Sequence, residues 1–180
     1  DWVAGLTVVT GTGEVVRCNK GLVKNATGYD LRHLLIGSEG TLGFVVEAEI
    51  RLATPPAPQS VMVLGVEKFG DLLNVLQTFQ AKLTLSAFEF FSDLALAKVT
   101  AHRDLNRPLA EDCAFYALLE YDAGDDGAAL AAFEETVAEG WVTDGVISQS
   151  DAQAAALWSL REGITESIAP YTPYKNDLSV

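Results

Sequence analysis

The sequence has few of the residues that build metal centres or disulfide frameworks. It contains two cysteines, Cys18 and Cys113, and two histidines, His33 and His102, among 180 residues. The cysteines have neither zinc-site spacing nor the density of a disulfide scaffold, and the histidines lack neighbouring ligands. We therefore expect no metal site, and buried reduced thiols that suit a cytoplasmic protein.

Long apolar runs and basic residues are also scarce. No apolar stretch approaches the roughly 20 residues that cross a bilayer, so we expect no transmembrane segment. The chain has 12 basic and 25 acidic side chains, for a net charge of −13. Such a surface repels nucleic acids and anionic membranes, which argues against both as partners. Most of the excess lies in residues 58–180, with nineteen acids and seven bases, so a basic residue in a pocket there would be notable.

Both ends of the sequence lie inside patterned segments. Residues 1–5 already have a strand-like pattern, without an initiating Met or a basic signal region. Residues 174–180 resemble the beginning of another strand. We therefore expect the sequence to be a segment of a longer protein.

The first 54 residues show the alternation of strands. Residues 6–10 and 14–17 flank a glycine-rich turn and predict a hairpin. A short helix is predicted over 30–36, followed by the glycine-rich segment Gly37–Gly43. Residues 44–52 then alternate apolar and charged side chains, which predicts a strand with one face in a core and one in water.

Proline marks a boundary, because the three prolines of residues 55–58 cannot donate ladder hydrogen bonds. We place a linker at 55–58, between domains covering 1–54 and 59–180. Strands and helices alternate in the second domain, with strands at 61–66, 86–91, 115–121 and 142–148 and helices at 69–83, 93–101, 128–139 and 151–168. This order predicts an α+β protein whose second domain is a ferredoxin-like α/β sandwich, with helices on one face of a mainly antiparallel sheet. The aromatic residues near these strands are assigned to the core: Phe88, Phe90, Phe91, Tyr116 and Trp141.

The glycine-rich segment is the first candidate for binding. Three glycines in seven residues, Gly37, Gly40 and Gly43, allow the backbone to approach a ligand and to present amide N–H groups. The segment lacks the residues of a phosphate-binding loop and the order of a nicotinamide fingerprint. The residues alone favour a turn before a strand.

The second candidate lies near the end of the chain. Arg161 and Thr165 are four positions apart on a predicted helix and share a face, and Lys175 follows in an extended segment. A guanidinium, a hydroxyl and an ammonium suit the carboxylates of an anionic substrate. The residues alone favour a plainer explanation, in which Arg161 pairs with a surface acid and the other two carry no function.

Motifs in both stretches resemble one flavoprotein family. Lys-Asn-x-Thr-Gly-Tyr-Asp-Leu at 24–31 and Gly-Ser-Glu-Gly-Thr-Leu-Gly at 37–43 resemble the end of the FAD domain in vanillyl-alcohol-oxidase-like flavoproteins. Trp-x-Leu-Arg-Glu-x-Ile-Thr-Glu at 158–166 and Tyr-Lys-x-Asp-Leu-Ser at 174–179 resemble the substrate motif of the branch with D-2-hydroxyglutarate dehydrogenase, D-lactate dehydrogenase and glycolate oxidase. Gly163 departs from that motif, where many members carry a larger residue, and glycine costs about 1 kcal/mol within a helix.

The resemblance implies a function for each domain. Residues 1–54 would be the last part of an FAD-binding α+β domain and residues 59–180 a truncated substrate-cap domain. FAD would lie against the backbone at Glu39, Gly40, Gly43, Phe44 and Val45, with Glu39 helping to hold the loop. Arg161, Thr165 and Lys175 would bind the carboxylates of a D-2-hydroxy acid, of D-2-hydroxyglutarate or D-lactate type, which is oxidised to the 2-oxo acid by hydride transfer to FAD.

The family's catalytic residues are expected beyond residue 180, and its main flavin loop before residue 1. We therefore expect the chain alone to bind FAD poorly and to be inactive. The sequence does not identify the electron acceptor, and it is compatible with a homodimer. The alternative is a non-enzymatic ferredoxin-like module that binds a small anion or mediates dimerisation. That alternative leaves the Gly37–Gly43 loop unexplained.

Overall fold

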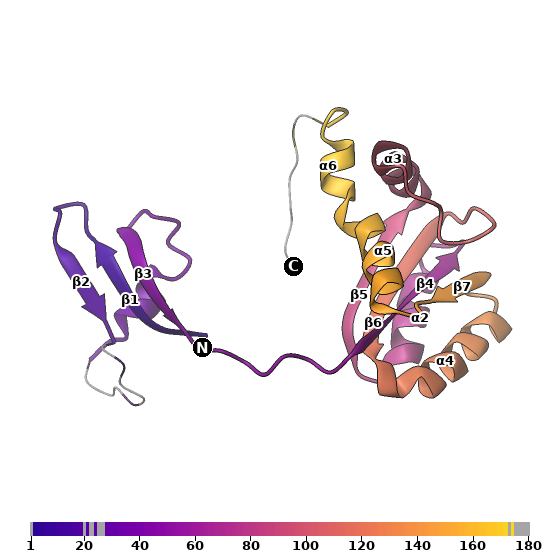
Figure 1. The fold of residues 1–180 in the computed structure, drawn as a ribbon, viewed down its shortest axis with the longest axis horizontal. Helices are drawn as coiled ribbons and strands as arrows, with labels where there is room; N and C mark the ends of the chain where they lie inside the picture. The colour runs from indigo at the N-terminus through magenta and orange to yellow at the C-terminus, as the bar shows by residue number, and fades with distance from the viewer. Residues whose placement is uncertain (1, 20, 22–23, 25–27, 173, 175–180) are drawn as a thin grey trace. The chain divides into compact units, whose positions relative to one another are not determined.

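The chain forms two compact units, residues 1–55 and 56–180. The computed structural model describes residues 2–19, 21, 24, 28–172 and 174 (Figure 1). The units divide within the proline-rich segment. Both contain helices and antiparallel strands, which confirms the α+β class.

A three-stranded antiparallel sheet in the order β2-β1-β3 forms the first unit. Its strands are β1 (Val3–Val9), β2 (Val15–Cys18) and β3 (Phe44–Ile50). The predicted hairpin is confirmed, since β1 pairs with β2 and the Thr10 amide donates to the Glu14 carbonyl across the turn at 2.9 Å. Helix α1 (Leu31–Leu35) begins after the N-cap Asp30, whose carboxylate accepts a hydrogen bond from the Arg32 amide at 3.1 Å.

The first unit has a small core, and the prediction of a half-buried strand at 44–52 is wrong for this chain. Leu6, Val8 and Cys18 are buried, whereas every residue of β3 is exposed, including Phe44 at 73%. A three-stranded sheet with one five-residue helix is too small to cover both of its faces. A register shift opposite Thr7 and Val8 also interrupts the alternation along β3.

The second unit contains a four-stranded antiparallel sheet in the order β5-β6-β4-β7. Its strands are β4 (Gln59–Val66), β5 (Leu85–Ser92), β6 (Phe115–Asp122) and β7 (Asp144–Ile147). Helix α2 (Asp71–Gln80) connects β4 to β5, and the short turn η1 (Ala123–Asp125) with helix α4 (Asp126–Ala138) connects β6 to β7. Two βαβ units with these interleaved strands form the predicted ferredoxin-like arrangement.

Helices cover both faces of this sheet, so the prediction that they lie on one face is wrong. One core joins the sheet to α2 and α4, through residues such as Phe79 and Ala132. The other core joins it to α3 (Asp93–Arg103) and α5 (Asp151–Glu162), through residues such as Leu96 and Leu160. The physical reason is that α3, inserted between β5 and β6, and the C-terminal helices add a second layer to the ferredoxin-like core. Figure 1 shows α5 in front of the sheet and α6 (Ile164–Ile168) continuing from it beside α3.

The predicted helix 151–168 is broken at Gly163 into α5 and α6. A Cβ atom at Gly163 would lie 2.9 Å from the Ser159 carbonyl oxygen and 3.0 Å from both Val99 Cγ1 and Arg103 Nε. Helix α3 therefore packs so closely that a side chain at this position would force Val99 or Arg103 to shift by a few tenths of an ångström. Gly163 permits this packing, which corrects its interpretation as merely a destabilising helix residue.

The sequence also assigns the cysteines and the aromatic Phe90 to the interior. Both cysteines are free and buried, as predicted. Phe90 is 49% exposed, so its assignment to the core is wrong. It lies on the edge strand β5, where its ring contacts that of Phe69 edge-on at 5.6 Å between centroids. An edge strand has a neighbouring strand on one side only, and its side chains are correspondingly less covered.

Candidate functional site

The glycine-rich segment between α1 and β3 has a conformation that requires its glycines. Gly37 and Gly40 have φ angles of 84° and 80°, in the left-handed region. A Cβ atom at Gly43 would lie 2.6 Å from Val8 Cγ1 and 3.1 Å from the Val9 carbonyl oxygen, so Gly43 lets the segment enter the sheet beside β1. Glu39 also has a positive φ, of 49°, which is uncommon for a residue with a side chain.

The five residues assigned to the cofactor line one surface hollow of about 390 Å³. They are Glu39, Gly40, Gly43, Phe44 and Val45. Among the described residues, the amides of Glu39 and Gly40 donate to no other backbone carbonyl, so they are available to oxygen atoms of a ligand. Phe44 and Val45 are exposed beside them, so the hollow is lined in part by apolar side chains.

Helix α1 is attached to the sheet by Arg32, which the sequence analysis did not single out. Its Nη1 donates to the carbonyl oxygens of Val3 and Ala4, both at 2.8 Å. Its Nη2 lies 2.5 Å from Asp30 Oδ2. The hydrogen bonds from Arg32 hold the pKa of Asp30 at about 2, below its ordinary value of 3.8. This clamp sets the position at which the glycine-rich segment begins.

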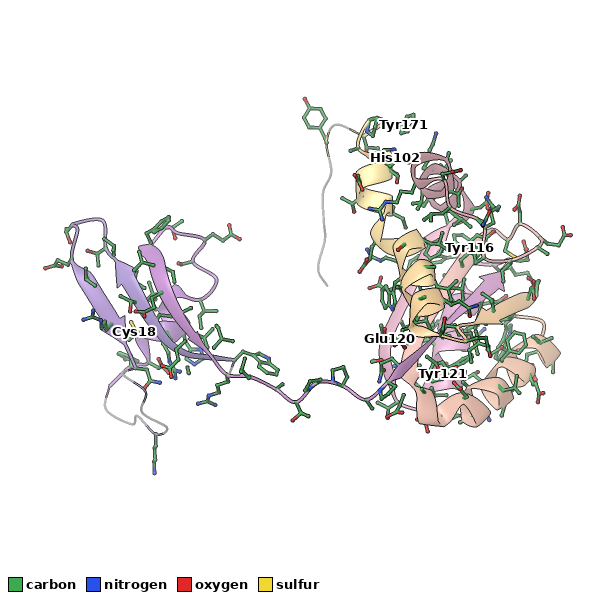
Figure 2. All side chains as sticks on the ribbon, viewed as in Figure 1. Cys18, His102, Tyr116, Glu120, Tyr121 and Tyr171 are labelled. Carbon is green, nitrogen blue, oxygen red and sulfur yellow. The ribbon has the colours of Figure 1, made fainter. Side chains whose placement is uncertain are left out.

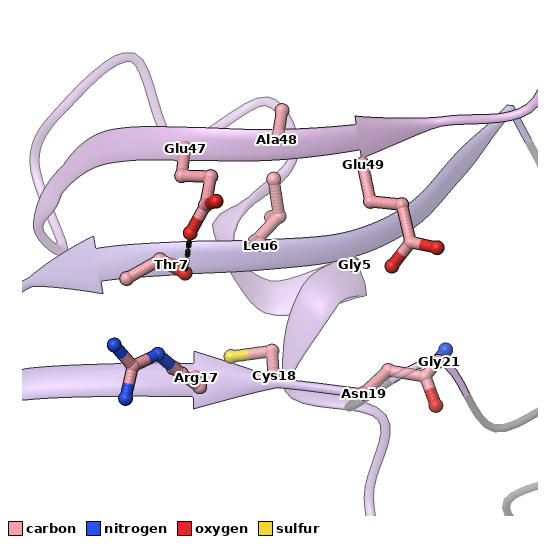
Figure 3. A pocket seen from close by; sticks show the side chains of 10 residues that line it. All are labelled: Gly5, Leu6, Thr7, Arg17, Cys18, Asn19, Gly21, Glu47, Ala48 and Glu49. Atoms are coloured by element: carbon pink, nitrogen blue, oxygen red, sulfur yellow. Dashed lines mark hydrogen bonds between the residues drawn. The ribbon is translucent and has the colours of Figure 1, made fainter.

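A second hollow, of about 420 Å³, lies over the central part of the same sheet (Figure 3). Its lining is mostly apolar in area and includes the polar side chains of Thr7, Arg17 and Asn19. The Thr7 hydroxyl donates to Glu47 Oε2 at 2.8 Å, and Asn19 Nδ2 donates to the Ala4 carbonyl at 2.6 Å. These bonds stabilise the sheet, and no motif in the sequence indicated this hollow.

Arg161 lies near the end of α5 and forms an ion pair with Glu89 of β5. Its Nε and Nη2 both lie 3.1 Å from Glu89 Oε2. One turn earlier on α5, Trp158 Nε1 donates to Glu120 Oε2 of β6 at 2.8 Å (Figure 2 labels Glu120). The carboxylates of Glu89 and Glu120 therefore hold one face of α5 against the sheet.

Of the other two residues assigned to the substrate, the structure describes Thr165 alone. Thr165 is exposed on α6, and Lys175 lies outside the described residues. Gly163, with the break between α5 and α6, separates Thr165 from Arg161. A substrate carboxylate at Arg161 would have to share the guanidinium with Glu89, which occupies Nε and Nη2 on one edge of the group.

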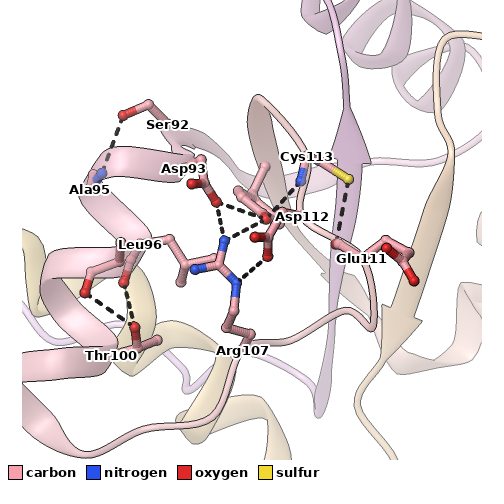
Figure 4. A network of polar contacts seen from close by, with 11 residues as sticks. Ser92, Asp93, Ala95, Leu96, Thr100, Arg107, Glu111, Asp112 and Cys113 are labelled. Atoms are coloured by element: carbon pink, nitrogen blue, oxygen red, sulfur yellow. Dashed lines mark hydrogen bonds and ion pairs between the residues drawn. The ribbon is translucent and has the colours of Figure 1, made fainter.

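A polar network around Arg107 connects the segment between α3 and β6 to the start of α3 and to β6 (Figure 4). Arg107 pairs with Asp93 and, through Nε at 2.7 Å, with Asp112. The Tyr116 hydroxyl accepts from Arg107 Nη2 at 3.1 Å and from the Cys113 amide at 3.0 Å. Burial raises the pKa of Tyr116. These hydrogen bonds and ion pairs hold the segment in place, although the buried Arg107 Nε makes only the ion-pair contact with Asp112 and no hydrogen bond among the described residues.

Two features are absent from the described residues. In this part of the chain no helix combines the length and apolar character that a membrane span requires. The same residues contain no cluster of three or more side chains suited to hold a metal ion.

Comparison with curated proteins gives close relatives across the whole chain. D-2-hydroxyglutarate dehydrogenase of Xanthomonas citri pv. viticola is 59% identical, over 100% of this chain and 39% of its own length. The enzyme of the same name from Stutzerimonas stutzeri is 56% identical with the same coverage. The mitochondrial D-2-hydroxyglutarate dehydrogenase of Bos taurus is 40% identical, over 99% of this chain and 34% of its own. The chain thus spans well under half the length of these relatives.

Solved structures with low sequence identity share the fold. Alkyldihydroxyacetonephosphate synthase matches with a TM-score of 0.60 and 16% identity, over 95% of this chain and 33% of its own. 4-Ethylphenol oxidase from Gulosibacter chungangensis matches with a TM-score of 0.58 and 14% identity, over 96% of this chain and 41% of its own. The family profile described as "FAD linked oxidases, C-terminal domain" matches residues 55–180, and the chain belongs to this family.

Proposed function

We propose that this chain is part of an FAD-dependent dehydrogenase that oxidises a D-2-hydroxy acid, with D-2-hydroxyglutarate as the preferred substrate. The observation that carries the proposal is the 59% identity with a D-2-hydroxyglutarate dehydrogenase over the whole chain. We assign residues 1–54 to the end of the FAD-binding domain, 55–58 to a linker and 59–180 to the substrate cap. The two units of the structure and the family match at 55–180 support this division.

The residues proposed to face the cofactor fit a flavin. FAD is the cofactor that gives the family its name, and when bound it would accept a hydride. The amides of Glu39 and Gly40 can donate to oxygen atoms of the cofactor. Gly43 keeps the backbone free of a side chain, the exposed Phe44 ring can cover part of a flat ring, and Val45, whose side chain points to the other face of β3, would contribute its backbone. The common hollow of these residues supports this assignment.

Binding and orientation are the tasks proposed for the cap. Arg161 offers a planar pair of N–H donors to a carboxylate, Thr165 a hydroxyl, and Lys175 a point charge. Two cationic side chains favour a dicarboxylate over a monocarboxylate. Holding the carboxylates would place the C2–H bond in line for transfer, and orientation of this kind lowers the barrier of a reaction substantially.

The test uses the whole protein that contains this chain. It is purified with FAD and assayed with a dye as the electron acceptor. We expect oxidation of D-2-hydroxyglutarate with a kcat/KM at least about tenfold above those for D-lactate and glycolate. Arg161→Gln should raise the KM for D-2-hydroxyglutarate by about tenfold or more, since a charge-assisted pair is lost. Lys68→Gln, at an exposed position, is the matched control.

Two results would contradict this proposal. An FAD-containing protein that oxidises none of these hydroxy acids would exclude the activity. An unchanged KM in the Arg161→Gln variant would exclude the role of that residue.

The alternative prediction, a non-enzymatic ferredoxin-like module, is not favoured, because the relatives align with the first 54 residues as well as with the cap. The electron acceptor and a homodimeric state are not addressed by these observations. The cytoplasmic location stays a prediction from the two reduced thiols.

A further inference from the structure

A cleft of about 360 Å³ lies between α3 and α6, in the cap unit. Three polar side chains line it: Lys98, His102 and Ser167. Tyr171, which follows α6, lines it as well. Figure 2 labels His102 and Tyr171 at the end of the unit where these helices meet.

Ser167 is buried in this cleft without a partner. The residue is 2% exposed, and its Oγ has no hydrogen-bond partner within the described part of the chain. Buried hydroxyl groups in native proteins nearly always have a protein or ligand partner. A hydroxyl of this kind in a residue that lines a cleft is therefore a candidate partner for a ligand, which would reach Ser167 Oγ after a small shift of the groups that now cover it.

Lys98 brings a positive charge to the same cleft without an acidic partner. Its Nζ lies 3.9 Å from the centroid of the Tyr171 ring, and among the described residues it has no carboxylate within 4 Å. Two other cations of this unit do have acidic partners, since Arg103 pairs with Glu166 at 2.6 Å and Arg161 pairs with Glu89 at 3.1 Å. In a chain of net charge −13, an unpaired ammonium group in a cleft is well suited to an anion.

His102 adds a ring N–H donor on the same side of α3, one turn after Lys98. The nearest acid, Glu166, lies 4.0 Å from His102 Nε2. Its carboxylate is already bound by Arg103, and the hydrogen bond from that side chain lowers the pKa of Glu166. The carboxylate nearest to His102 is thus paired with Arg103.

We propose that the α3–α6 cleft binds a small oxyanion, a carboxylate or a phosphate, through the Lys98 ammonium group, a His102 ring N–H and the Ser167 hydroxyl. The site is separate from the proposed substrate residues. Thr165 and Ser167 are two positions apart on α6, which places them about 200° apart around the helix, and Thr165 is exposed while Ser167 is buried. The inference does not depend on the proposed dehydrogenase activity.

The test is a proton NMR titration of the 180-residue chain with inorganic phosphate and, separately, with glutarate at constant pH. The chain has two histidines, His33 and His102, so their ring C–H resonances can be assigned with a His102→Gln variant. We expect the His102 resonances to shift along a saturable curve. The His33 resonances, which belong to the other unit, should stay in place.

Variants then locate the ligand. Lys98→Gln should weaken binding by roughly tenfold, through the loss of one charged donor, and Ser167→Ala by several-fold. Lys68→Gln, at an exposed position outside the cleft, should bind as the parent chain does. Circular dichroism of each variant shows whether the fold is retained.

The outcomes distinguish phosphate from a carboxylate as the ligand. They also distinguish binding in the α3–α6 cleft from binding at the proposed substrate site. Saturation by phosphate alone, or by glutarate alone, identifies the preferred oxyanion. No saturable shift with either probe overturns the inference, as does unchanged affinity in a folded Lys98→Gln variant. If Arg161→Gln abolishes binding while Lys98→Gln does not, the anion occupies the proposed substrate site and the cleft is not the binding site.

Discussion

Arg161 of α5 and Glu89 of β5 form an ion pair across 72 positions of the chain, with Nε and Nη2 each 3.1 Å from one carboxylate oxygen. Their side chains are 39% and 37% exposed. A pair this accessible contributes at most about 1 kcal/mol to stability. Its larger consequence is orientation, because the guanidinium has one defined position on the sheet before any ligand arrives.

A double-mutant cycle tests this pair. We expect Glu89→Gln and Arg161→Gln to couple by about 0.3–1 kcal/mol in the free energy of unfolding, measured by urea denaturation of the cap unit. Lys82 and Glu135, which lie 2.9 Å apart on another face, provide a control pair of the same kind. A coupling energy of zero for Arg161 and Glu89 would contradict this prediction.

Gly163→Ala should destabilise the cap unit, although alanine favours helices. The new methyl group would lie 2.9–3.0 Å from Ser159, Val99 and Arg103, and overpacking of this kind typically costs about 1–3 kcal/mol. The measurement is the free energy of unfolding in urea.

Gly127→Ala in α4 is the matched control for this substitution, because a Cβ atom there meets nothing within 4 Å. It should stabilise the unit by up to about 1 kcal/mol. If both substitutions changed the free energy of unfolding in the same direction, the packing argument for Gly163 would be contradicted.

The stability of the first unit should fall at acid pH through Asp30. Its folded pKa of about 2 lies below the ordinary 3.8, so its stabilising contribution is complete above about pH 5 and is lost as pH falls toward 2. A carboxyl carbon NMR titration should give the low pKa directly. In an Arg32→Gln variant the pKa should return toward the ordinary value, and an unchanged low pKa would show that Arg32 is not its cause.

Cys18 and Cys113 should react slowly with iodoacetamide in the folded chain. They are 7% and 4% exposed, and burial raises the pKa of both thiols. Less thiolate and less access both slow alkylation, so at pH 8 we expect rates at least about tenfold below those in urea. Mass spectrometry of time points measures both sites, and rapid native labelling of either would contradict its burial.

Some features of the fold could be predicted because they depend on neighbours in the sequence. The hairpin of β1 and β2 follows from alternating apolar residues around a glycine-rich turn. The four strands and most helices of the cap follow from local periodicity and occur in the predicted order. The motif around 37–45 was assigned to one site, and its residues line one hollow.

Other features depended on contacts between distant residues. The run Val61–Val66 is buried on both faces of the sheet, and its nearly unbroken apolar character was the signal for a second helical layer. The break at Gly163 depends on the approach of α3, some sixty positions earlier. The pairing of Arg161 with Glu89, and the cleft that contains Ser167, depend on the same tertiary packing.

The sequence by itself determined the elements, the boundary near the prolines and the family motifs, because turn chemistry, periodicity and short motifs act over a few neighbouring residues. Only the tertiary structure decided which faces of the sheets are covered, which acid holds Arg161 and which polar groups are left without partners. The physical reason is that burial and charge pairing depend on residues far apart in the chain, whose proximity no local pattern specifies.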